Sequence, residues 1–341
     1  MPLKHLLLEH LKIEWERKLP LLQGKTIVSI YFGGGTPTLF APSGISEILK
    51  WVKQSGVSVS SDCEITMEGN PEDGSKELFL GLKELGINRI SLGVQSLDER
   101  SLQTLERIHS AQRARSAIQE AAQAGFQNIS IDLMYDLPGQ TESSWQYTLD
   151  QLADLPIQHL SLYNLTIEPH TSFHKRKVQI PDGPISLAFL TRALEKLKQI
   201  GLERYEISAF AKKGRESRHN LGYWTGRPFL GYGPSAFSYW EGERFQNIAH
   251  LQRYARLLKE GKSPVDFQEK LSDPASVKER LAIQLRLKIG VDLSQFGSLP
   301  PETGAGIEKL INLGFLTQDG NRLQLTERGM LFYDSVATEL I

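Results

Sequence analysis

Glycines follow the first β-like run of the chain, at a point where a ligand could approach the backbone. Residues 26–32 form the run, and Gly33-Gly34-Gly35-Thr36-Pro37 comes directly after it. Consecutive glycines permit close approach and present unobstructed N–H groups to a ligand. A tight turn explains the same pattern, so the glycines leave both interpretations open.

Carboxylates stand near the ends of two later β-like runs. Glu68 lies in Met67-Glu68-Gly69-Asn70-Pro71, and Asp132 precedes Leu133 to Gly139. A carboxylate at the mouth of a sheet costs free energy unless it binds something polar. Glu68 can accept hydrogen bonds from the hydroxyl or amino groups of a ligand, or it can be an exposed acid at the end of a strand. Asp132 can likewise belong to a binding site, or it can be a buried acid that caps a backbone turn.

Two further polar side chains follow the third run. Gln95 ends Gly93-Val94-Gln95, and Arg107 begins Arg107-Ile108-His109. The amide of Gln95 is both donor and acceptor, and the forked guanidinium of Arg107 suits a carboxylate. Each also fits a solvated surface position. Four such features at successive strand ends predict one shared pocket.

A histidine and several aromatic residues form a second constellation. The run His219-Asn220-Leu221-Gly222-Tyr223-Trp224 is followed by a glycine-rich stretch from Leu230 to Phe237. Imidazole can bind haem iron, and flat rings can pack on a porphyrin. An aromatic core that contains one hydrogen-bonded histidine is the other interpretation.

Alternating strands and helices must position these residues. The predicted strands are 26–32, 62–68, 89–93, 128–133, 159–165 and 204–209, and most are expected to be apolar on both faces. The predicted helices are 43–53, 75–85, 112–124, 142–152 and 186–199. Six strand–helix units in series favour an α/β fold with a partial parallel barrel, and a doubly wound sheet is the competing arrangement.

The pattern changes after Gly242. Residues 251–341 alternate helices with a short ribbon at 315–325, and the helix at 305–313 before it makes the segment resemble a winged helix. We therefore predict domains at 1–242 and 243–341. Basic residues are scattered and matched by acids, so we expect a structural or partner-docking domain and no nucleic-acid binding.

Composition narrows the class of protein. The 341 residues carry a net charge of −1, which offers no general attraction for nucleic acids or anionic membranes. Charged residues interrupt the apolar stretches before they reach membrane-spanning length. Residues 1–19 also contain several charged residues, so they are predicted to form an amphipathic helix and not a secretory signal. We expect a cytoplasmic protein without an integral membrane segment.

Together these motifs resemble the radical-SAM HemN/HemW family over nearly the whole chain. The resemblance implies a barrel that binds S-adenosylmethionine, with Gly34, Gly35 and Thr36 at its methionine part. It implies that Glu68, Gln95, Arg107 and Asp132 complete that site.

The histidine motif distinguishes the branches of this family. His-Asn-x-x-Tyr-Trp resembles the haem-chaperone branch, which implies haem binding with His219 as the iron ligand and a haem-receiving partner protein. Phe237 stands where that branch usually has a second histidine, so a second ligand is not assigned.

The chain differs from this family in its cysteine content. Catalytic members share a Cys-x-x-x-Cys-x-x-Cys loop whose thiolates hold a [4Fe–4S] cluster. This chain has one cysteine, Cys63, and by the resemblance it lacks the loop and the barrel strand before it. We expect an N-terminally shortened haem chaperone, and no residue is assigned a catalytic role. The alternatives are an oxygen-independent coproporphyrinogen III oxidase or a cluster-free inactive remnant.

Overall fold

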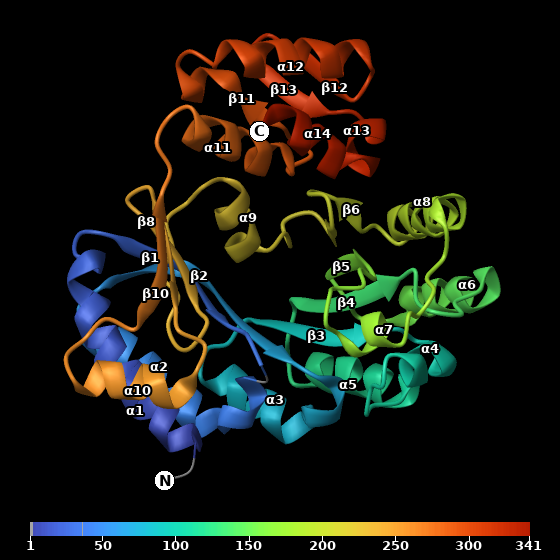
Figure 1. Ribbon diagram of the computed structural model, residues 1–341. Helices are drawn as coiled ribbons and strands as arrows, with labels where there is room; N and C mark the ends of the chain where they lie inside the picture. Colours follow the sequence, from blue (N-terminus) through green and yellow to red (C-terminus); the bar gives the residue numbers. More distant parts are fainter. Residues whose placement is uncertain (1–2, 36) are drawn as a thin grey trace. The chain divides into compact units, whose positions relative to one another are not determined.

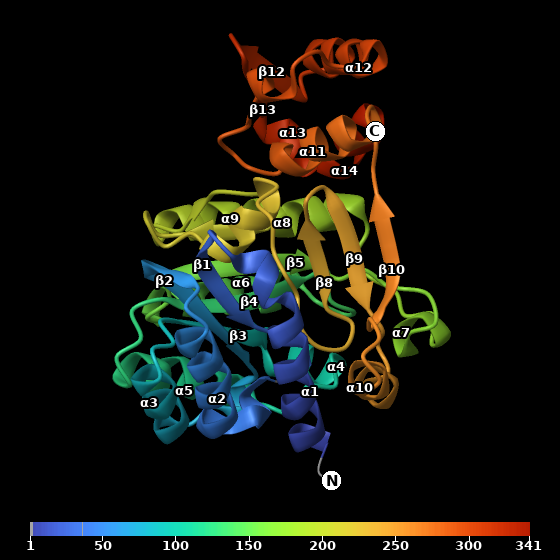
Figure 2. The same cartoon turned by 90° about the vertical axis from the view of Figure 1, so that its left-hand side faces the viewer.

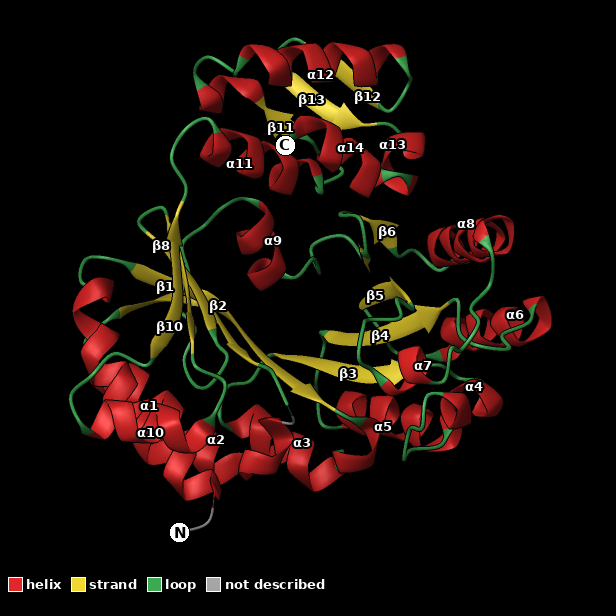
Figure 3. Ribbon diagram, viewed as in Figure 1, coloured by secondary structure: helices red, strands yellow, loops and turns green. Residues whose placement is uncertain are grey.

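The computed structural model describes residues 3–35 and 37–341, which form two compact units (Figures 1 and 3). The barrel unit comprises residues 28–45 and 62–217. The flanking unit comprises residues 1–27, 46–61 and 218–341. The domain boundary after Gly242 stays a prediction.

A curled seven-stranded sheet in the order β1-β2-β3-β4-β5-β7-β6 forms the half-barrel, and it confirms the predicted α/β class. β2 to β5 pair in parallel. The strands are β1 (Thr26–Phe32), β2 (Ser58–Gly69), β3 (Arg89–Gln95), β4 (Ile129–Tyr135), β5 (His159–Asn164), β6 (Glu203–Arg204) and β7 (Ala209–Ala211).

The sixth predicted strand, 204–209, differs in detail from the expectation. It is mostly a turn, and the short strands β6 and β7 on either side of it pair antiparallel with each other, while β7 also pairs antiparallel with β5. The Glu206 carboxylate accepts a hydrogen bond from the Ser208 N–H at 3.0 Å, and the Tyr205 N–H donates to the Ala209 carbonyl at 3.1 Å. Such local bonds satisfy the backbone without an extended strand.

Helices cover the outer face of the sheet (Figure 1). They are α3 (Lys76–Glu84), α5 (Ala111–Gln123), α6 (Glu142–Gln151) and α8 (Gly183–Gln199). Each begins after a residue whose side chain accepts a hydrogen bond from the first turn: Ser75, Ser110, Thr141 and Asp182 respectively. Beneath them the outward side chains of β3 and β4, such as Leu92 and Ile131, are buried.

The inner face of the sheet is polar, so the expectation of strands that are apolar on both faces was wrong. Strand register places Glu68, Ser91, Ser130 and His159 in one row across β2 to β5. Asp132 is paired with Ser161 further along the same face. Alternation along each strand therefore separates an apolar packing face from a polar inner face.

In the flanking unit, α1 (Leu3–Lys18) lies beside α10 (Leu251–Lys259) in both views (Figures 1 and 2). An antiparallel sheet in the order β10-β9-β8 belongs to the same unit. Its strands are β8 (Phe237–Trp240), β9 (Glu243–Asn247) and β10 (Val265–Lys270). The short α9 (Arg218–Trp224) precedes them and carries the histidine motif.

The end of the chain has the predicted winged-helix-like form. A sheet of order β11-β13-β12 lies among helices, and β12 and β13 are the ribbon predicted at 315–325. The elements are α11 (Ala275–Leu285), β11 (Val291–Asp292), α12 (Pro301–Asn312), β12 (Leu316–Asp319), β13 (Arg322–Leu325), α13 (Glu327–Leu331) and α14 (Tyr333–Leu340).

The remaining α-helices of the described residues are α2 (Ala41–Gln54), α4 (Glu99–Thr104) and α7 (Ser172–Lys175). Among the residues that the structure describes, no helix combines the length and apolar character needed to cross a bilayer.

Candidate functional site

The glycine loop after β1 has the backbone conformation that glycine permits. Gly34 and Gly35 have φ angles of 77° and 63°, and the positions where their β-carbons would stand are open. The Gly34 N–H donates a 3.1 Å hydrogen bond to Oε2 of Glu68. Thr36, the third predicted residue of this loop, lies outside the described residues.

Glu68 is held between the glycine loop and Tyr31. The Tyr31 hydroxyl donates a 2.6 Å hydrogen bond to its Oε1. Burial and the nearby Glu68 carboxylate raise the pKa of Tyr31, so its hydroxyl remains a donor at neutral pH. A β-carbon at Gly33 would lie 3.0 Å from Oε2 of Glu68, and glycine therefore allows the loop to pass close to the carboxylate.

Asp132 points from β4 toward the same inner face. Burial raises its pKa to about 6, and a hydrogen bond with Ser161 opposes that shift. Its carboxylate is within electrostatic reach of the Glu68 carboxylate and the Arg107 guanidinium. The structure thus brings three of the predicted site residues together.

A buried histidine fixes the segment that carries Arg107. His109 forms a 2.9 Å contact from Nδ1 to the Glu72 carboxylate and a 3.2 Å contact from Nε2 to the Val94 carbonyl. Gln95, at the end of β3, has a φ of 65°, a left-handed conformation that is uncommon for a residue with a side chain. Both Arg107 and Gln95 are half-buried.

These groups match the polar parts of S-adenosylmethionine. Glu68 and Asp132 are acceptors for hydroxyl and amino groups, Arg107 is a cation for a carboxylate, and Gln95 offers both functions. Sequence reasoning missed Tyr31 and Ser161, although the alternation of Tyr31 with Gly33 and of Ser161 with His159 placed them on the same inner face.

The second candidate site, in the flanking unit, is built around His219 on α9. Its Nε2 is 2.7 Å from the Tyr223 hydroxyl one turn along the helix, and the two rings meet edge-to-face with centroids 4.8 Å apart. Tyr223 packs on Phe229 in the same manner at 4.6 Å. Burial, with a further contribution from Arg227, lowers the pKa of His219 to about 4.

The glycine-rich stretch after α9 is anchored to α1. Glu14 is 1% exposed, and its Oε2 accepts a 2.7 Å hydrogen bond from the Gly233 N–H. The ammonium group of Lys18 bonds to the Gly231 carbonyl and to Glu14, both at 2.7 Å. At the end of the stretch, Phe237 is 48% exposed. Phe237, the first residue of β8, therefore does not lie in the core.

Some polar atoms of this region are buried without a hydrogen-bond partner among the described residues, and two of them belong to aromatic side chains. These two are Nε1 of Trp224 and the hydroxyl of Tyr232. The Trp224 ring instead packs on the Arg286 guanidinium, whose centre is 4.2 Å from the ring centroid. A site of neutral imidazole and aromatic rings fits a porphyrin that carries iron.

The residues described here do not fit a [4Fe–4S] cluster. Cys63 is the single cysteine of the chain, and its side chain is buried in β2. Within the described residues there is no group of three or more His, Cys, Asp or Glu side chains arranged to hold a metal ion.

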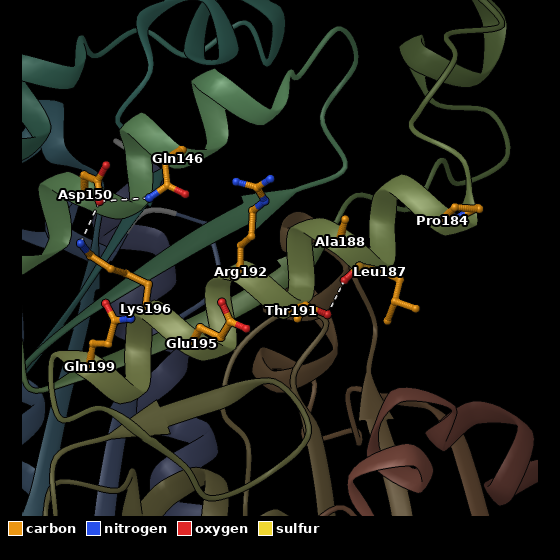
Figure 4. Close-up of a pocket in the computed structure, with 10 residues that line it drawn as sticks. All are labelled: Gln146, Asp150, Pro184, Leu187, Ala188, Thr191, Arg192, Glu195, Lys196 and Gln199. Carbon is orange, nitrogen blue, oxygen red and sulfur yellow. Dashed lines mark hydrogen bonds and ion pairs between the residues drawn. The ribbon is translucent and has the colours of Figure 1, made fainter.

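A surface pocket of about 620 Å³ lies along α6 and α8 (Figure 4). Asp150, Gln146 and Lys196 line it, and Asp150 accepts hydrogen bonds from the other two at 3.1 and 2.8 Å. It holds none of the predicted site residues.

Two family models match parts of the chain. Residues 11–152 match the radical SAM superfamily, and residues 271–332 match the HemN C-terminal domain. The heme chaperone HemW of Mycobacterium tuberculosis is 33% identical over 335 residues, which cover 97% of this chain and 85% of that protein. The heme chaperone HemW of Escherichia coli is 31% identical, with 96% and 88% covered.

A solved structure shares the fold. Coproporphyrinogen III oxidase (HemN) from Escherichia coli, described as a radical SAM enzyme, superposes with a TM-score of 0.86 at 23% identity and covers 99% of this chain and 83% of its own.

Proposed function

Because the chain belongs to the radical-SAM HemN/HemW family, we propose that it is a haem chaperone that holds haem iron through His219 and passes the haem to a recipient protein. The relatives named heme chaperone, with at least 85% of their length covered, support this choice within the family. The observation that carries the proposal is the position of His219 on α9, in contact with Tyr223.

The environment of His219 suits iron binding. An imidazole binds iron only when a ring nitrogen is unprotonated, and a pKa near 4 leaves His219 neutral throughout the physiological range. The hydroxyl of Tyr223 orients the ring through Nε2. Ligation through that nitrogen exchanges the hydrogen bond for a bond to iron, whereas ligation through Nδ1 keeps it.

S-adenosylmethionine is proposed to occupy the inner face of the barrel unit. When bound, it supplies a methionine carboxylate and amine together with ribose hydroxyls. Arg107 would bind the carboxylate, and Glu68 and Asp132 would accept hydrogen bonds from the amine and the hydroxyls. The N–H of Gly34 and the hydroxyl of Tyr31 hold Glu68 in place for this role, while Gly35 and Gln95 line the same region.

Haem titration of the purified chain tests the proposal. We expect His219→Ala to weaken haem binding about tenfold or more and to shift the Soret band, because the iron loses its protein ligand. His5→Ala is the matched control, since His5 is exposed on α1 and belongs to the same unit.

The control variant should bind haem like the unaltered chain. Equal affinity and an unchanged Soret band for His219→Ala would remove His219 from the site. Absence of stoichiometric binding by the unaltered chain would refute the chaperone function itself.

A further inference from the structure

A rare turn sets the direction of Gln95, one of the predicted cofactor residues. The Ser96 N–H donates a 2.8 Å hydrogen bond to the Val94 carbonyl, and Gln95 between them has a φ of 65°. A bond of this span around a residue of positive φ forms the strained type of γ-turn. The register of β3 against β4 shifts at the same place, between Leu92 and Gln95. Such an irregularity re-aims a side chain, and the Gln95 amide folds back over Gly93, whose β-carbon would lie 3.0 Å from Nε2.

His109 binds the carbonyl of this turn. Its side chain has no exposed surface, and its Nε2 lies 3.2 Å from the Val94 carbonyl. Because a carbonyl only accepts, Nε2 carries a proton and donates it to this bond. The other ring nitrogen, Nδ1, lies 2.9 Å from Oε2 of Glu72 in the loop after β2. A strained backbone conformation persists only where surrounding contacts fix it, and the buried imidazole supplies such a contact.

The same histidine belongs to the segment that carries Arg107. Glu106, just before it, has a φ of 56°, and the Arg107 N–H donates a 3.0 Å hydrogen bond to the Leu102 carbonyl of α4. His109 follows two residues after Arg107, and Ser110 next to it caps α5. The backbone at Arg107 is therefore fixed on one side by α4 and on the other by the buried ring.

The imidazole can act on a ligand only indirectly, because none of it is exposed. It joins the strand end that carries Gln95 to the segment that carries Arg107. Resting on the proposed binding of S-adenosylmethionine at the inner face, we propose that His109 is a positioning residue, which holds Gln95 and Arg107 in place for the amino-acid end of the cofactor. A guanidinium and a carboxylate form their paired hydrogen bonds only when both groups are held in the right geometry.

Two ligands separate positioning from general stability. S-adenosylhomocysteine carries the amino-acid end, whereas 5′-methylthioadenosine has the same adenosine and thioether without it. Calorimetric titrations compare the unaltered chain with His109→Leu, His109→Gln and His174→Gln. His174 is exposed on α7 of the same unit, and its ring packs beside His170. We expect His109→Leu to weaken binding of S-adenosylhomocysteine about tenfold, as loss of one hydrogen bond to a charged group does, and binding of 5′-methylthioadenosine much less.

His109→Gln should restore most of the lost affinity, because its amide N–H can still donate to the Val94 carbonyl. His174→Gln should bind both ligands like the unaltered chain. A purely structural role of His109 would weaken both ligands equally in His109→Leu. Equal weakening, or full affinity of His109→Leu for S-adenosylhomocysteine, would overturn the proposal. Failure of the unaltered chain to bind either ligand would refute the proposed cofactor site, and the positioning role with it.

Discussion

At the scale of single residues, Asp132 is the group whose protonation links the candidate cofactor site to stability. Burial raises its pKa to about 6 in the folded chain, whereas an unfolded Asp titrates near ~3.9. The folded state then binds more protons than the unfolded state between those values. Stability is therefore lost as the pH rises from about 4 to about 6, and the loss is complete above that window.

Replacement of this carboxylate by a neutral amide should stabilise the protein. We expect Asp132→Asn to raise the free energy of unfolding by ~1–3 kcal/mol at pH 7.5, and the gain should shrink markedly at pH 5. Thermal melts at the two pH values measure this change. Exposed Asp154→Asn serves as the control and should leave the melting temperature unchanged.

An Asp132→Asn variant that is less stable than the unaltered chain at pH 7.5, or one whose gain in unfolding free energy is identical at both pH values, would contradict the assignment of a raised pKa to Asp132.

The same variant should also lose affinity for S-adenosylmethionine, because the proposed site uses the Asp132 carboxylate as a hydrogen-bond acceptor.

Sequence reasoning identified Glu68 and Asp132 because acids at strand ends are conspicuous. It did not identify Tyr31, Ser161 or His109, because each reads as an ordinary strand or loop residue until the register is known. The partner of Glu68, Tyr31, is 37 residues away in the chain. Polar partners at such separations follow from strand pairing and not from local pattern.

At the scale of elements, a buried carboxylate joins α1 to the glycine-rich stretch. Glu14 accepts hydrogen bonds from the Asn247 amide at 2.7 Å and the Tyr254 hydroxyl at 2.6 Å, besides those from Gly233 and Lys18. Four donors satisfy both carboxylate oxygens, which is the condition for a buried charge to be tolerated.

Loss of the charge at this position should loosen the flanking unit. Glu14→Gln presents an amide N–H to groups that are themselves donors, so we expect it to lower the free energy of unfolding by ~2–4 kcal/mol. Glu16→Gln, on the exposed side of α1, is the matched control and should change it by less than ~0.5 kcal/mol.

The midpoint of urea unfolding measures both variants. Equal midpoints for Glu14→Gln and Glu16→Gln would show that the buried network contributes nothing to stability.

The elements themselves were predicted more completely than their contacts. The range 26–32 is that of β1, and residues 1–19 contain α1. Burial of Glu14 was not predicted, because a glutamate in a charged helix reads as solvated and three of its four partners are more than 200 residues away. At 204–209 a parallel strand was predicted, but the segment is mostly a turn. A hydrogen bond from the Ser208 N–H to the Glu206 side chain favours that turn.

At the scale of the whole molecule, the number of cysteines limits which iron–sulfur clusters the 341-residue chain can bind. One buried thiol cannot supply the three thiolates of a radical-SAM cluster. Reconstitution of the purified chain with iron and sulfide should therefore yield no stoichiometric [4Fe–4S] cluster, and Cys63→Ala should behave identically.

Iron and sulfide analysis together with electron paramagnetic resonance after reduction measures this outcome. Four irons and four sulfides bound per chain, or reductive cleavage of S-adenosylmethionine by the chain alone, would contradict the prediction.

The central claim, that His219 binds haem iron, is tested most directly by resonance Raman spectroscopy of the ferrous haem complex. We predict an iron–imidazole stretching band for the unaltered chain, its loss in His219→Ala, and its return when free imidazole is added to the variant. An iron–imidazole band that persists in His219→Ala without added imidazole would show that another residue holds the iron and would contradict the account.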